Sequence, residues 1–315
     1  MTRVMVLGAS GQLGWQCLHD LPAAGFDVLG LGRDTLDVSR HGERQWRARL
    51  ETVLRDFDPH WVINALAYTA VDRAEDEPEM AIQVNATFPQ VLAQTIRAVL
   101  PTAFLLQCST DYVFDGLSAL PYREQDQTDP KTAYGKSKLL GERAVLSGFE
   151  RSFVLRFSWV VGEHGQNFPK TMLRLASERE QLRVVGDQRG VPSPTPFLVG
   201  EFIRLMRYCA KLDAASGVLD RRLFHVVPSG ESNWHAYAQW CLEIAASDPI
   251  QSKRLKLSSQ DIERIQTEEY PTKAARPRNS LLNCASWCEL HDITMLPDWI
   301  TVTKPVVEKI CMKIG

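Results

Sequence analysis

Residues 3–21 read RVMVLGASGQLGWQCLHDL, and this stretch decides the fold. Its apolar start is typical of a short buried strand, and its end has the spacing of a helix. Gly8, Gly11 and Gly14 join the two segments. Glycines let a backbone turn tightly and approach a pyrophosphate, whose negative charge then lies at the positive end of the following helix. The stretch therefore predicts a dinucleotide-binding turn at the start of an α/β sheet.

Strand-like and helix-like segments alternate along the rest of the chain. Short apolar runs recur between amphipathic segments, and Asp58-Pro59 separates one helix from the strand that follows it. We expect strands at residues 3–7, 27–31, 61–64, 103–106, 153–162 and 223–227, with helices between them. This alternation predicts an α/β protein with a doubly wound parallel sheet, the Rossmann arrangement, which holds its cofactor at the carboxyl ends of the strands.

A second stretch, residues 105–143, brings hydroxyl, phenol and ammonium groups together. A strand ends at Ser109 and Thr110, and Tyr134 and Lys138 follow on a predicted helix. Residues four apart share one helix face, so the ammonium can lie near the phenol oxygen. A neighbouring cation lowers the pKa of a tyrosine, which suits proton exchange with a carbonyl or alcohol oxygen. The pattern indicates carbonyl–alcohol chemistry, with an ordinary solvated helix face as the alternative.

Composition and charge indicate that the partner is a small molecule. The chain has 315 residues, of which 44% are hydrophobic and 23% charged, and its formal net charge is −2. Because a nucleic-acid binder normally carries a basic surplus, we expect no nucleic-acid partner. No apolar run approaches the ~20 residues of a membrane span, and the N-terminus lacks the apolar core of a signal peptide. We therefore expect a cytoplasmic protein with no membrane partner.

The seven cysteines are odd in number and scattered among apolar neighbours, which is typical of reduced, packed thiols. Cys284, Cys288 and His291 form the one cluster with metal-like spacing. The cluster lacks a convincing fourth ligand and a matching second half, so we predict no metal site.

Three further strings carry a resemblance to a known family. They are Ser109–Gly116 (STDYVFDG), Pro121-Tyr122-x-Glu124, and Tyr134-Gly-Lys-Ser-Lys138-x-x-Gly141-Glu142. Over nearly its whole length the chain resembles the extended short-chain dehydrogenase/reductase superfamily and, within it, the dTDP-4-dehydrorhamnose reductase family. The resemblance implies reduction of dTDP-4-dehydro-6-deoxy-L-mannose to dTDP-L-rhamnose by NADPH, with NADH left open as a second donor. It makes Tyr134 the proton donor, Lys138 its activator and Thr110 the group that orients the carbonyl.

The resemblance also implies which residues bind the cofactor. They are Gly8, Ser10, Gly11, Gln12, Leu13, Arg33, Asp37, Val38, Ala65, Leu66, Ala67, Tyr134 and Lys138. Arg33 follows the second strand, where NAD-preferring proteins usually place an acid for the ribose 2′-hydroxyl. Its cation suits the 2′-phosphate of NADP, and a solvated loop arginine is the alternative. Leu66 stands where the family usually has alanine. Asn85 resembles an asparagine that holds the lysine through water, with a purely structural role as the alternative.

Substrate contacts are implied in the same way. They are Ser109, Thr110, Tyr112, Trp159, Asn167, Gln188 and Arg276. The resemblance places Trp159 beside the sugar ring and Asn167 near the diphosphate, although a tryptophan at a strand end can also be core packing. Arg276 opens an Arg-Pro-x-x-Ser-x-Leu string and can grip a diphosphate in bidentate fashion, with a surface arginine as the alternative. The family usually has tyrosine where Val161 stands.

We expect the sheet domain to hold residues 1–161 and 193–229, and a smaller substrate domain to hold residues 162–192 and 230–315. Three other functions stay open, and so does a homodimer. The first is reduction of the 4-keto group of another nucleotide sugar. An epimerase or dehydratase of the same superfamily would need an Asp-Glu pair where this chain has Asp111-Tyr112. A non-catalytic NADP-binding regulatory subunit would not need the intact set of Thr110, Tyr134 and Lys138.

Overall fold

A six-stranded sheet is the largest element of the computed structural model, which describes residues 1–40, 42–214 and 221–313. The strand order is β10-β5-β4-β3-β1-β2, and every neighbouring pair is parallel. The six strands are β1 (Arg3–Leu7), β2 (Asp27–Leu31), β3 (Trp61–Asn64), β4 (Phe104–Thr110), β5 (Ser152–Phe157) and β10 (Leu223–His225). The predicted Rossmann-like α/β sheet is confirmed.

Helices connect the strands and make up much of the remaining chain. The α-helices are α1 (Gln12–Ala23), α2 (Glu43–Phe57), α3 (Val71–Ala74), α4 (Pro78–Ile82), α5 (Phe88–Val99), α6 (Ala133–Gly148), α7 (Phe168–Glu178), α8 (Thr195–Ala214), α9 (Trp234–Ser247), α10 (Ala285–Leu290) and α11 (Trp299–Lys313). Shorter turns of helix are the π-helix η1 (Gln83–Thr87) and the 3-10 helices η2 (Asp111–Val113), η3 (Ser259–Asp261) and η4 (Thr267–Glu269).

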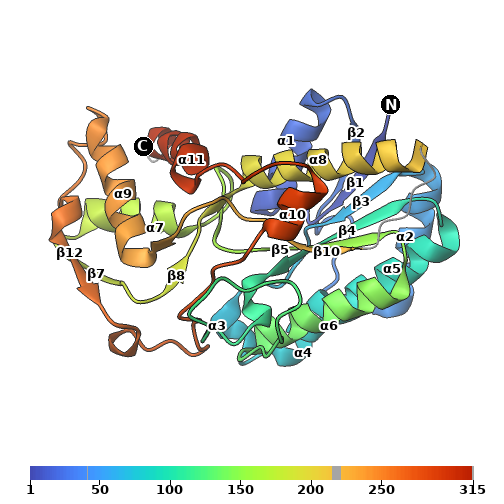
Figure 1. Ribbon diagram of the computed structural model, residues 1–315, viewed down its shortest axis with the longest axis horizontal. Helices are drawn as coiled ribbons and strands as arrows, with labels where there is room; N and C mark the ends of the chain where they lie inside the picture. Colours follow the sequence, from blue (N-terminus) through green and yellow to red (C-terminus); the bar gives the residue numbers. More distant parts are fainter. Residues whose placement is uncertain (41, 215–220, 314–315) are drawn as a thin grey trace.

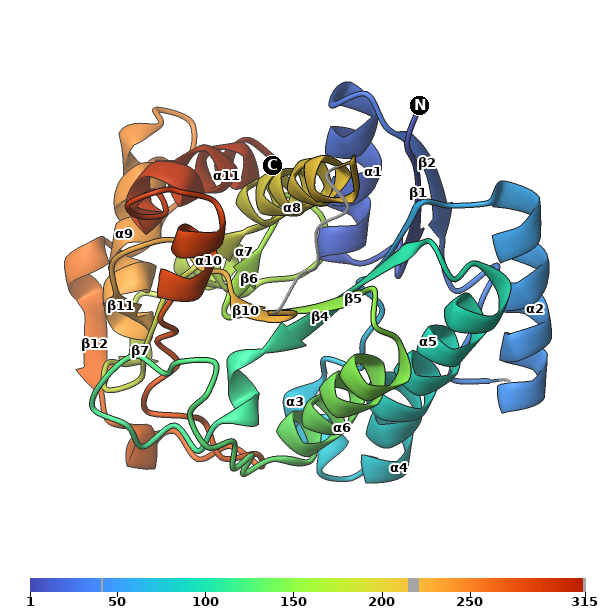
Figure 2. The same cartoon turned by 45° about the vertical axis from the view of Figure 1, so that its right-hand side comes forward.

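Both faces of the sheet are covered by helices (Figure 1, Figure 2). One face packs against α1, α8 and α10, and there Leu13, Phe202 and Trp287 are buried. The other face packs against α2, α5 and α6, where Leu50 and Phe88 are buried. Every residue of β4 and β5 is buried, as expected for central strands of a parallel sheet with helices on both sides.

The chain changes direction across the sheet at β1, which lies between β2 and β3. The register places Leu7 opposite Leu31 on one side and opposite Asn64 on the other. Open α/β sheets bind their ligands in the crevice at such a switch point. The glycine turn after β1 and the loop after β3 therefore form the two sides of one crevice.

A smaller lobe lies beside the sheet (Figure 1). It contains α7, α9 and α11, and its own core buries Met172, Tyr237 and Val307. Short paired strands connect and support it: β6 (Val160–Val161) with β9 (Ser193–Pro194), β7 (Leu182–Val185) with β12 (Ile262–Ile265), and β8 (Arg189–Gly190) with β11 (Ser232–Asn233).

The division into two domains stays a prediction. One segment assigned to the smaller domain packs in the core of the sheet domain instead. Leu282, Trp287 and Leu296 lie in the part assigned to the smaller domain, yet all three are buried with the residues of the sheet core. The indole Nε1 of Trp287 donates a 2.7 Å hydrogen bond to Glu201 of α8. This segment therefore packs on the face of the sheet that α1 and α8 cover, although it follows most of the smaller lobe in the sequence.

Candidate active site

The glycine turn has the shape that a dinucleotide pyrophosphate requires. Gly8 has a φ of 76°, and a Cβ built on it would lie 2.7 Å from the backbone of Leu66. A Cβ on Gly14 would lie 2.1 Å from the Gly8 carbonyl oxygen. Gly11 precedes α1, whose first N–H groups have no side-chain cap. Because the turn leaves room for close backbone approach and presents free N–H donors, these residues fit the expected cofactor.

The smaller lobe contacts this turn directly. The Gln12 side-chain oxygen accepts hydrogen bonds from the Gly162 N–H at 3.1 Å and from the Asn167 amide at 3.0 Å. A ring nitrogen of His164 lies 3.1 Å from the Ser10 carbonyl oxygen. Asn167 is also the N-cap of α7, since its side-chain oxygen accepts from the Lys170 N–H. Thus Asn167, predicted to bind substrate, joins the cofactor turn to α7.

The predicted contacts for the adenosine end lie just after β2. Arg33 is exposed there. Asp37 accepts hydrogen bonds from the backbone and hydroxyl of Ser39, and the hydroxyl contact is the main reason that the pKa of Asp37 is lowered. Arg40 and Arg33 lower this pKa further. The loop is therefore held in place by Asp37, with the Arg33 guanidinium facing solvent.

The loop after β3 is tied to the catalytic helix through Asn85. The Ala65 N–H donates to the Leu7 carbonyl oxygen, which fixes the start of the loop. The Asn85 side chain accepts from the Tyr68 N–H at 2.9 Å and donates to the Ser137 hydroxyl at 3.0 Å. Asn85 lies in the π-helix η1, a rare element that is frequent at functional sites. Its side chain therefore positions Tyr68 and Ser137, and it makes no hydrogen bond to Lys138.

Thr110 and Tyr134 form the centre of the site. Thr110 ends β4, and Tyr134 lies in the first turn of α6, which Thr132 caps through the Gly135 N–H. The Thr110 side chain lies close enough to the Tyr134 phenol to lower its pKa, while the Thr110 hydroxyl donates a 3.0 Å hydrogen bond to Asp111. A Cβ on Gly135 would lie 2.2 Å from the Tyr112 carbonyl oxygen, so α6 can approach this loop closely only with glycine there. The structure thus brings together two of the three predicted catalytic residues.

Lys138 makes a different contact from the one expected. Its ammonium donates a 2.6 Å hydrogen bond to the Cys108 carbonyl oxygen. Burial raises the pKa of Tyr134 well above its ordinary value, and the Thr110 hydrogen bond offsets only part of this rise. Burial also lowers the pKa of Lys138. Lys138 is not among the groups that shift the pKa of Tyr134, so its role as activator stays a prediction, and burial keeps Tyr134 protonated.

Ser109 is directed away from the cavity. Its hydroxyl donates a 2.5 Å hydrogen bond to Glu142, which forms a buried ion pair with Arg156 at 2.6 Å. Side chains alternate between the two faces of a strand, so Ser109 and Thr110 cannot both face the same side. Ser109 supports the interior network between β4, β5 and α6 in this structure.

A cavity of about 770 Å³ lies between the smaller lobe and the loop that follows β4. Four of the predicted substrate residues line it, namely Tyr112, Trp159, Gln188 and Arg276. The rings of Tyr112 and Tyr134 are 5.5 Å apart, which places the cavity beside the catalytic pair. Ser109 and Asn167 do not line the cavity, and neither do the predicted catalytic residues Thr110, Tyr134 and Lys138.

Trp159 is held in an unusual conformation at the cavity wall. Its φ is 45°, a left-handed value that is uncommon for a bulky residue. Its ring stacks on that of Trp234 with centroids 3.6 Å apart. A Cβ on Gly190 would lie 2.4 Å from the Trp159 ring, so the ring packs flat against a glycine. This packing gives the cavity a rigid aromatic wall.

Arg276 has a free donor at the cavity. One of its terminal nitrogens donates to Asp72 at 2.5 Å, and Asp72 also accepts from the Ala274 N–H at 3.0 Å. The other terminal nitrogen, Nη1, is buried and has no hydrogen-bond partner. A buried guanidinium nitrogen without a partner is costly, and an anionic oxygen in the cavity would satisfy it.

The sequence reading missed several residues that line this cavity. They are Asp72, Phe168, Thr171, Met172, Leu175, Arg179, Arg183 and Trp234, among others. Arg179, Arg183 and Arg276 bring three positive charges against the one negative charge of Asp72. Phe168, Thr171, Met172 and Leu175 lie on one face of α7, which their i, i+3, i+4 and i+7 spacing could have shown. Asp72, Arg183 and Trp234 come from separate elements, so no local motif unites them.

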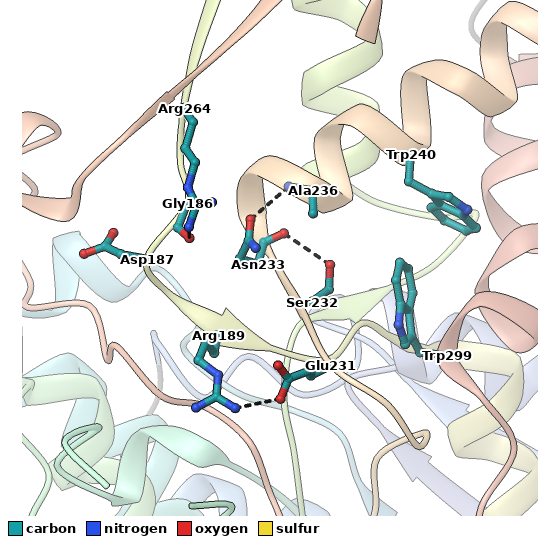
Figure 3. Close-up of a pocket in the computed structure, with 10 residues that line it drawn as sticks. All are labelled: Gly186, Asp187, Arg189, Glu231, Ser232, Asn233, Ala236, Trp240, Arg264 and Trp299. Atoms are coloured by element: carbon teal, nitrogen blue, oxygen red, sulfur yellow. Dashed lines mark hydrogen bonds and ion pairs between the residues drawn. The ribbon is translucent and has the colours of Figure 1, made fainter. Parts of the chain in front are cut away.

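A second cavity, of about 470 Å³, lies on the other side of β8 (Figure 3). Asp187 and Arg189 line it, and Arg189 pairs there with Glu231 at 2.6 Å. Gln188, between them in sequence, lines the first cavity instead. This alternation of extended backbone explains why only one residue of the predicted loop reaches the predicted substrate site.

Within residues 1–40, 42–214 and 221–313, no group of three or more His, Cys, Asp and Glu side chains is placed to hold a metal ion. Cys284, the first member of the cluster considered from the sequence, exchanges hydrogen bonds with the backbone of Val227. His291 packs edge-on against Trp287.

Comparison with known sequences gives matches over nearly the whole chain. The family model of the RmlD substrate binding domain matches residues 1–312. The dTDP-4-dehydrorhamnose reductase of Sinorhizobium fredii is 36% identical over 306 residues, which are 97% of this chain and 96% of that protein. The protein of the same name from Salmonella typhimurium is 34% identical over 296 residues, 94% of either chain.

Solved structures agree with these matches. A dTDP-4-dehydrorhamnose reductase from Clostridium acetobutylicum has a TM-score of 0.80 and 30% identity, covering 98% of this chain and 99% of that one. The enzyme of that name from Bacillus anthracis, solved in complex with NADP, has a TM-score of 0.82 and 29% identity over 100% of both chains. The resemblance seen in the sequence motifs is therefore confirmed. The chain belongs to the dTDP-4-dehydrorhamnose reductase family.

Proposed function

We propose that this protein reduces the 4-keto group of dTDP-4-dehydro-6-deoxy-L-mannose to give dTDP-L-rhamnose, with NADPH as the electron donor. The observation that carries the proposal is that the end of β4 and the first turn of α6 bring Thr110 and Tyr134 together, with the ring of Tyr112 5.5 Å from that of Tyr134. This pair lies at the carboxyl end of β4, beside a cavity large enough for a nucleotide sugar. Family membership supports the same activity.

The residues around the glycine turn fit NADPH, which supplies a hydride when bound. The backbone of Gly8, Gly11 and the first turn of α1 would hold the pyrophosphate. Arg33 would pair with the 2′-phosphate, since its guanidinium is exposed at the end of β2. NADH lacks this phosphate, so we expect it to be the weaker donor.

Tyr134 would give its proton to the ketone oxygen as negative charge develops there. Burial raises the pKa of its phenol, so Tyr134 holds a proton at neutral pH, as ketone reduction requires. Thr110 would donate a second hydrogen bond to the same oxygen and so orient the carbonyl. Lys138 would move from the Cys108 carbonyl oxygen to the nicotinamide ribose, where its charge also favours the phenolate left on Tyr134.

The cavity suits an anionic nucleotide sugar. Arg276 offers its unpaired nitrogen to a diphosphate, and Arg179 adds a further positive charge. Trp159 and Tyr112 line the cavity with apolar ring surface, which suits the carbon face of a sugar ring. We propose that Gln188 contacts the substrate from β8, while Ser109 and Asn167 act through the residues that they hold in place.

Location and assembly are part of the same proposal. No helix in the described ranges is long and apolar enough to cross a membrane. We propose a cytoplasmic enzyme that acts on a small molecule, and a homodimer as its assembly. Cell fractionation and sedimentation of the purified protein test these two points separately.

An assay of NADPH absorbance tests the function. Purified protein is mixed with NADPH and, in turn, with 4-ketosugars linked to dTDP, UDP and GDP. We expect fastest oxidation with dTDP-4-dehydro-6-deoxy-L-mannose, and a product that co-elutes with dTDP-L-rhamnose. Absence of NADPH oxidation with every ketosugar would contradict the proposal. A changed sugar configuration without net NADPH consumption would instead indicate an epimerase.

A further inference from the structure

Asp72 is a carboxylate in a cavity that is otherwise lined by positive charge. Among the described residues that line the proposed substrate cavity, Asp72 is the one acid, and Arg179, Arg183 and Arg276 are the bases. A negative charge at close range repels an anionic ligand. The proposed mechanism gives Asp72 no role that would offset this repulsion.

The two carboxylate oxygens of Asp72 have different partners. Asp72 lies in α3, which follows the loop after β3. Its Oδ1 accepts a 3.0 Å hydrogen bond from the Ala274 N–H, and its Oδ2 accepts a 2.5 Å hydrogen bond from Nη2 of Arg276. One carboxylate therefore fixes both the guanidinium of Arg276 and the main chain two positions before it.

The segment that carries Arg276 crosses from the smaller lobe to α3 (Figure 1, Figure 2). Beyond Arg276 its main chain is fixed to the loop after β4, because the Asn279 N–H donates a 3.0 Å hydrogen bond to the Gly116 carbonyl oxygen. Pro277 packs closely on Gly116, where a Cβ would lie 2.4 Å from the proline ring. The backbone of Arg276 is thus held from both sides, and Asp72 sets the direction of its side chain.

The contact with Asp72 leaves part of the Arg276 guanidinium available. The Arg276 side chain is 22% exposed and lines the cavity, and its Nη1 has no hydrogen-bond partner. The donors of a guanidinium form a rigid planar fork, so one terminal nitrogen can be held while the other binds a second anion. With Nη2 on Asp72, the fork has one orientation and Nη1 remains for a ligand.

We propose that Asp72 is the positioning residue of Arg276, which it holds by Nη2 so that Nη1 is presented to the diphosphate group of the nucleotide sugar. The inference rests on the proposed function, which places an anionic nucleotide sugar in this cavity. Asp72 acts only through Arg276 in this scheme. Because an arginine side chain loses much rotamer freedom when it is fixed, holding it before the ligand arrives lowers the entropic cost of binding.

Stability of the fold explains the Asp72–Arg276 pair less well. The Asp72 side chain is 47% exposed, and an ion pair with such exposure contributes little to stability. The same segment is also tied to the chain just after α3 by the ion pair of Lys273 with Asp76. Docking of the segment therefore does not depend on Asp72 alone, whereas the direction of the Arg276 side chain does.

Asp72→Asn tests the proposal because orientation and charge predict opposite results. Asparagine keeps the size but offers one acceptor oxygen for two donors, so Arg276 or the Ala274 N–H loses its partner. If Asp72 were only a negative charge in an anion site, its removal should tighten the binding of dTDP. We expect instead that the affinity for dTDP, measured by calorimetry, falls roughly tenfold.

Asp76→Asn is the matched control. It removes the same charge four positions further on and loosens the exposed contact with Lys273, and Asp76 does not line the cavity. Its affinity for dTDP should stay within about twofold of the wild type, because an exposed pair contributes little. A loss equal to that of Asp72→Asn would show that docking of the segment matters rather than the direction of Arg276, and would overturn the proposal.

A double-mutant cycle tests whether Asp72 acts through Arg276. Arg276→Ala should itself weaken dTDP binding, and adding Asp72→Asn to it should cause no further loss. Contributions of independent residues would add instead. A further fall in the double variant would show that Asp72 acts on the ligand by another path, and would contradict the proposal.

Steady-state kinetics separate positioning from a structural role near the catalytic tyrosine. Asp72→Asn should raise KM for the ketosugar roughly tenfold and leave kcat within a few-fold, because the lost binding is common to the ground and transition states. Ala74 of the same helix is buried in a cluster with Tyr134, so a general disturbance of α3 would lower kcat. A fall in kcat at unchanged KM would overturn the proposal.

The measurements distinguish failure of this inference from failure of the proposed function. If the wild type neither binds dTDP nor oxidises NADPH with any ketosugar, the proposed function fails and the inference with it. If the wild type reduces the ketosugar and Asp72→Asn binds dTDP as tightly as the wild type or more tightly, only the inference is wrong. An active wild type that does not bind dTDP would likewise overturn the inference alone.

Discussion

Gln12 and Asn167 are joined by a 3.0 Å hydrogen bond, although they stand 155 positions apart and lie in different lobes. Gln12 belongs to the cofactor turn. Asn167 caps α7, and the Thr171, Met172 and Leu175 side chains of that helix line the substrate cavity. A cofactor that binds the turn and restricts its motion should therefore also restrict the motion of α7, which forms one wall of the cavity. Such coupling is reciprocal for two ligands.

Asn167→Ala should weaken this coupling. We expect the affinity for dTDP to become less dependent on NADPH, and calorimetry with each ligand in the presence and absence of the other measures the change. The lost cap should also lower the free energy of unfolding by about 1 kcal/mol. Asn233→Ala is the control, since Asn233 caps α9 through the Ala236 N–H and lies outside the turn. It should lose similar stability and keep the coupling; equal coupling in both variants would contradict the prediction.

Arg33→Ala should narrow the preference for NADPH over NADH by roughly tenfold, because one charge-assisted contact with the 2′-phosphate is lost. NADH affinity should hardly change. Arg40→Ala provides the comparison, because Arg40 is 80% exposed and pairs with Asp37 at 3.4 Å on the same loop. Fluorescence titration with both nucleotides measures the ratio. A wild-type protein that prefers NADH would show that Arg33 does not bind the phosphate.

Glu142→Gln should destabilise the fold by about 3–5 kcal/mol, because it leaves the buried Arg156 without its counter-charge. The two side chains are 2% and 3% exposed. Glu178→Gln breaks an exposed pair with Arg174 and should cost less than about 0.5 kcal/mol. Denaturant unfolding of both variants measures the difference. Similar losses for the two would mean that the buried pair contributes no more than an exposed one.

Asp111 should make the folded protein more stable as pH falls, which is the opposite of the usual effect of a carboxyl group. Its pKa rises from an ordinary 3.8 to about 6 on folding, so the folded state binds more protons between these values. Its contribution is therefore full below about pH 4 and is lost as pH rises through about 6. Relative to Asp111→Asn, the wild type should gain up to about 3 kcal/mol as pH falls through this window.

Asp115 is the control for this sign. Hydrogen bonding to Tyr122 lowers the pKa of Asp115, so its contribution should be present above the unfolded pKa and lost as pH falls. The wild type should thus keep its stability relative to Asp115→Asn between about pH 6 and 4 and lose it only as pH falls below the unfolded pKa of about 3.8. Equal slopes for the two variants in unfolding titrations would show that Asp111 does not carry a raised pKa.

Residue spacing in the sequence predicted those parts of the site that lie within a single strand, turn or helix. The glycine turn follows β1 as the sequence indicated, and helical spacing placed Tyr134 and Lys138 on the same helix. Strand period could also have shown that Ser109 and Thr110 point to opposite faces, a signal that we did not use. Residue spacing is therefore sufficient to predict which side chains share a face of one helix or strand.

Contacts between distant elements were not predictable in this way. The ion pair of Asp72 and Arg276 joins residues 204 positions apart, and the π-helix that carries Asn85 has no local pattern that distinguishes it from an α-helix. The contact of Lys138 with the Cys108 carbonyl oxygen depends on how closely α6 packs on β4. Such contacts depend on tertiary packing, which residue spacing in a single chain does not specify.

Turnover of a dTDP-4-ketosugar by Tyr134→Phe tests the central claim most directly. The phenol proton matters only as the ketone oxygen becomes an alkoxide, so its loss should raise the barrier without much changing the bound state. We predict a fall of ~10²–10⁴-fold in turnover, with NADPH affinity by fluorescence close to that of the wild type. A Tyr134→Phe protein that reduces dTDP-4-dehydro-6-deoxy-L-mannose within a few-fold of the wild-type rate would contradict the account.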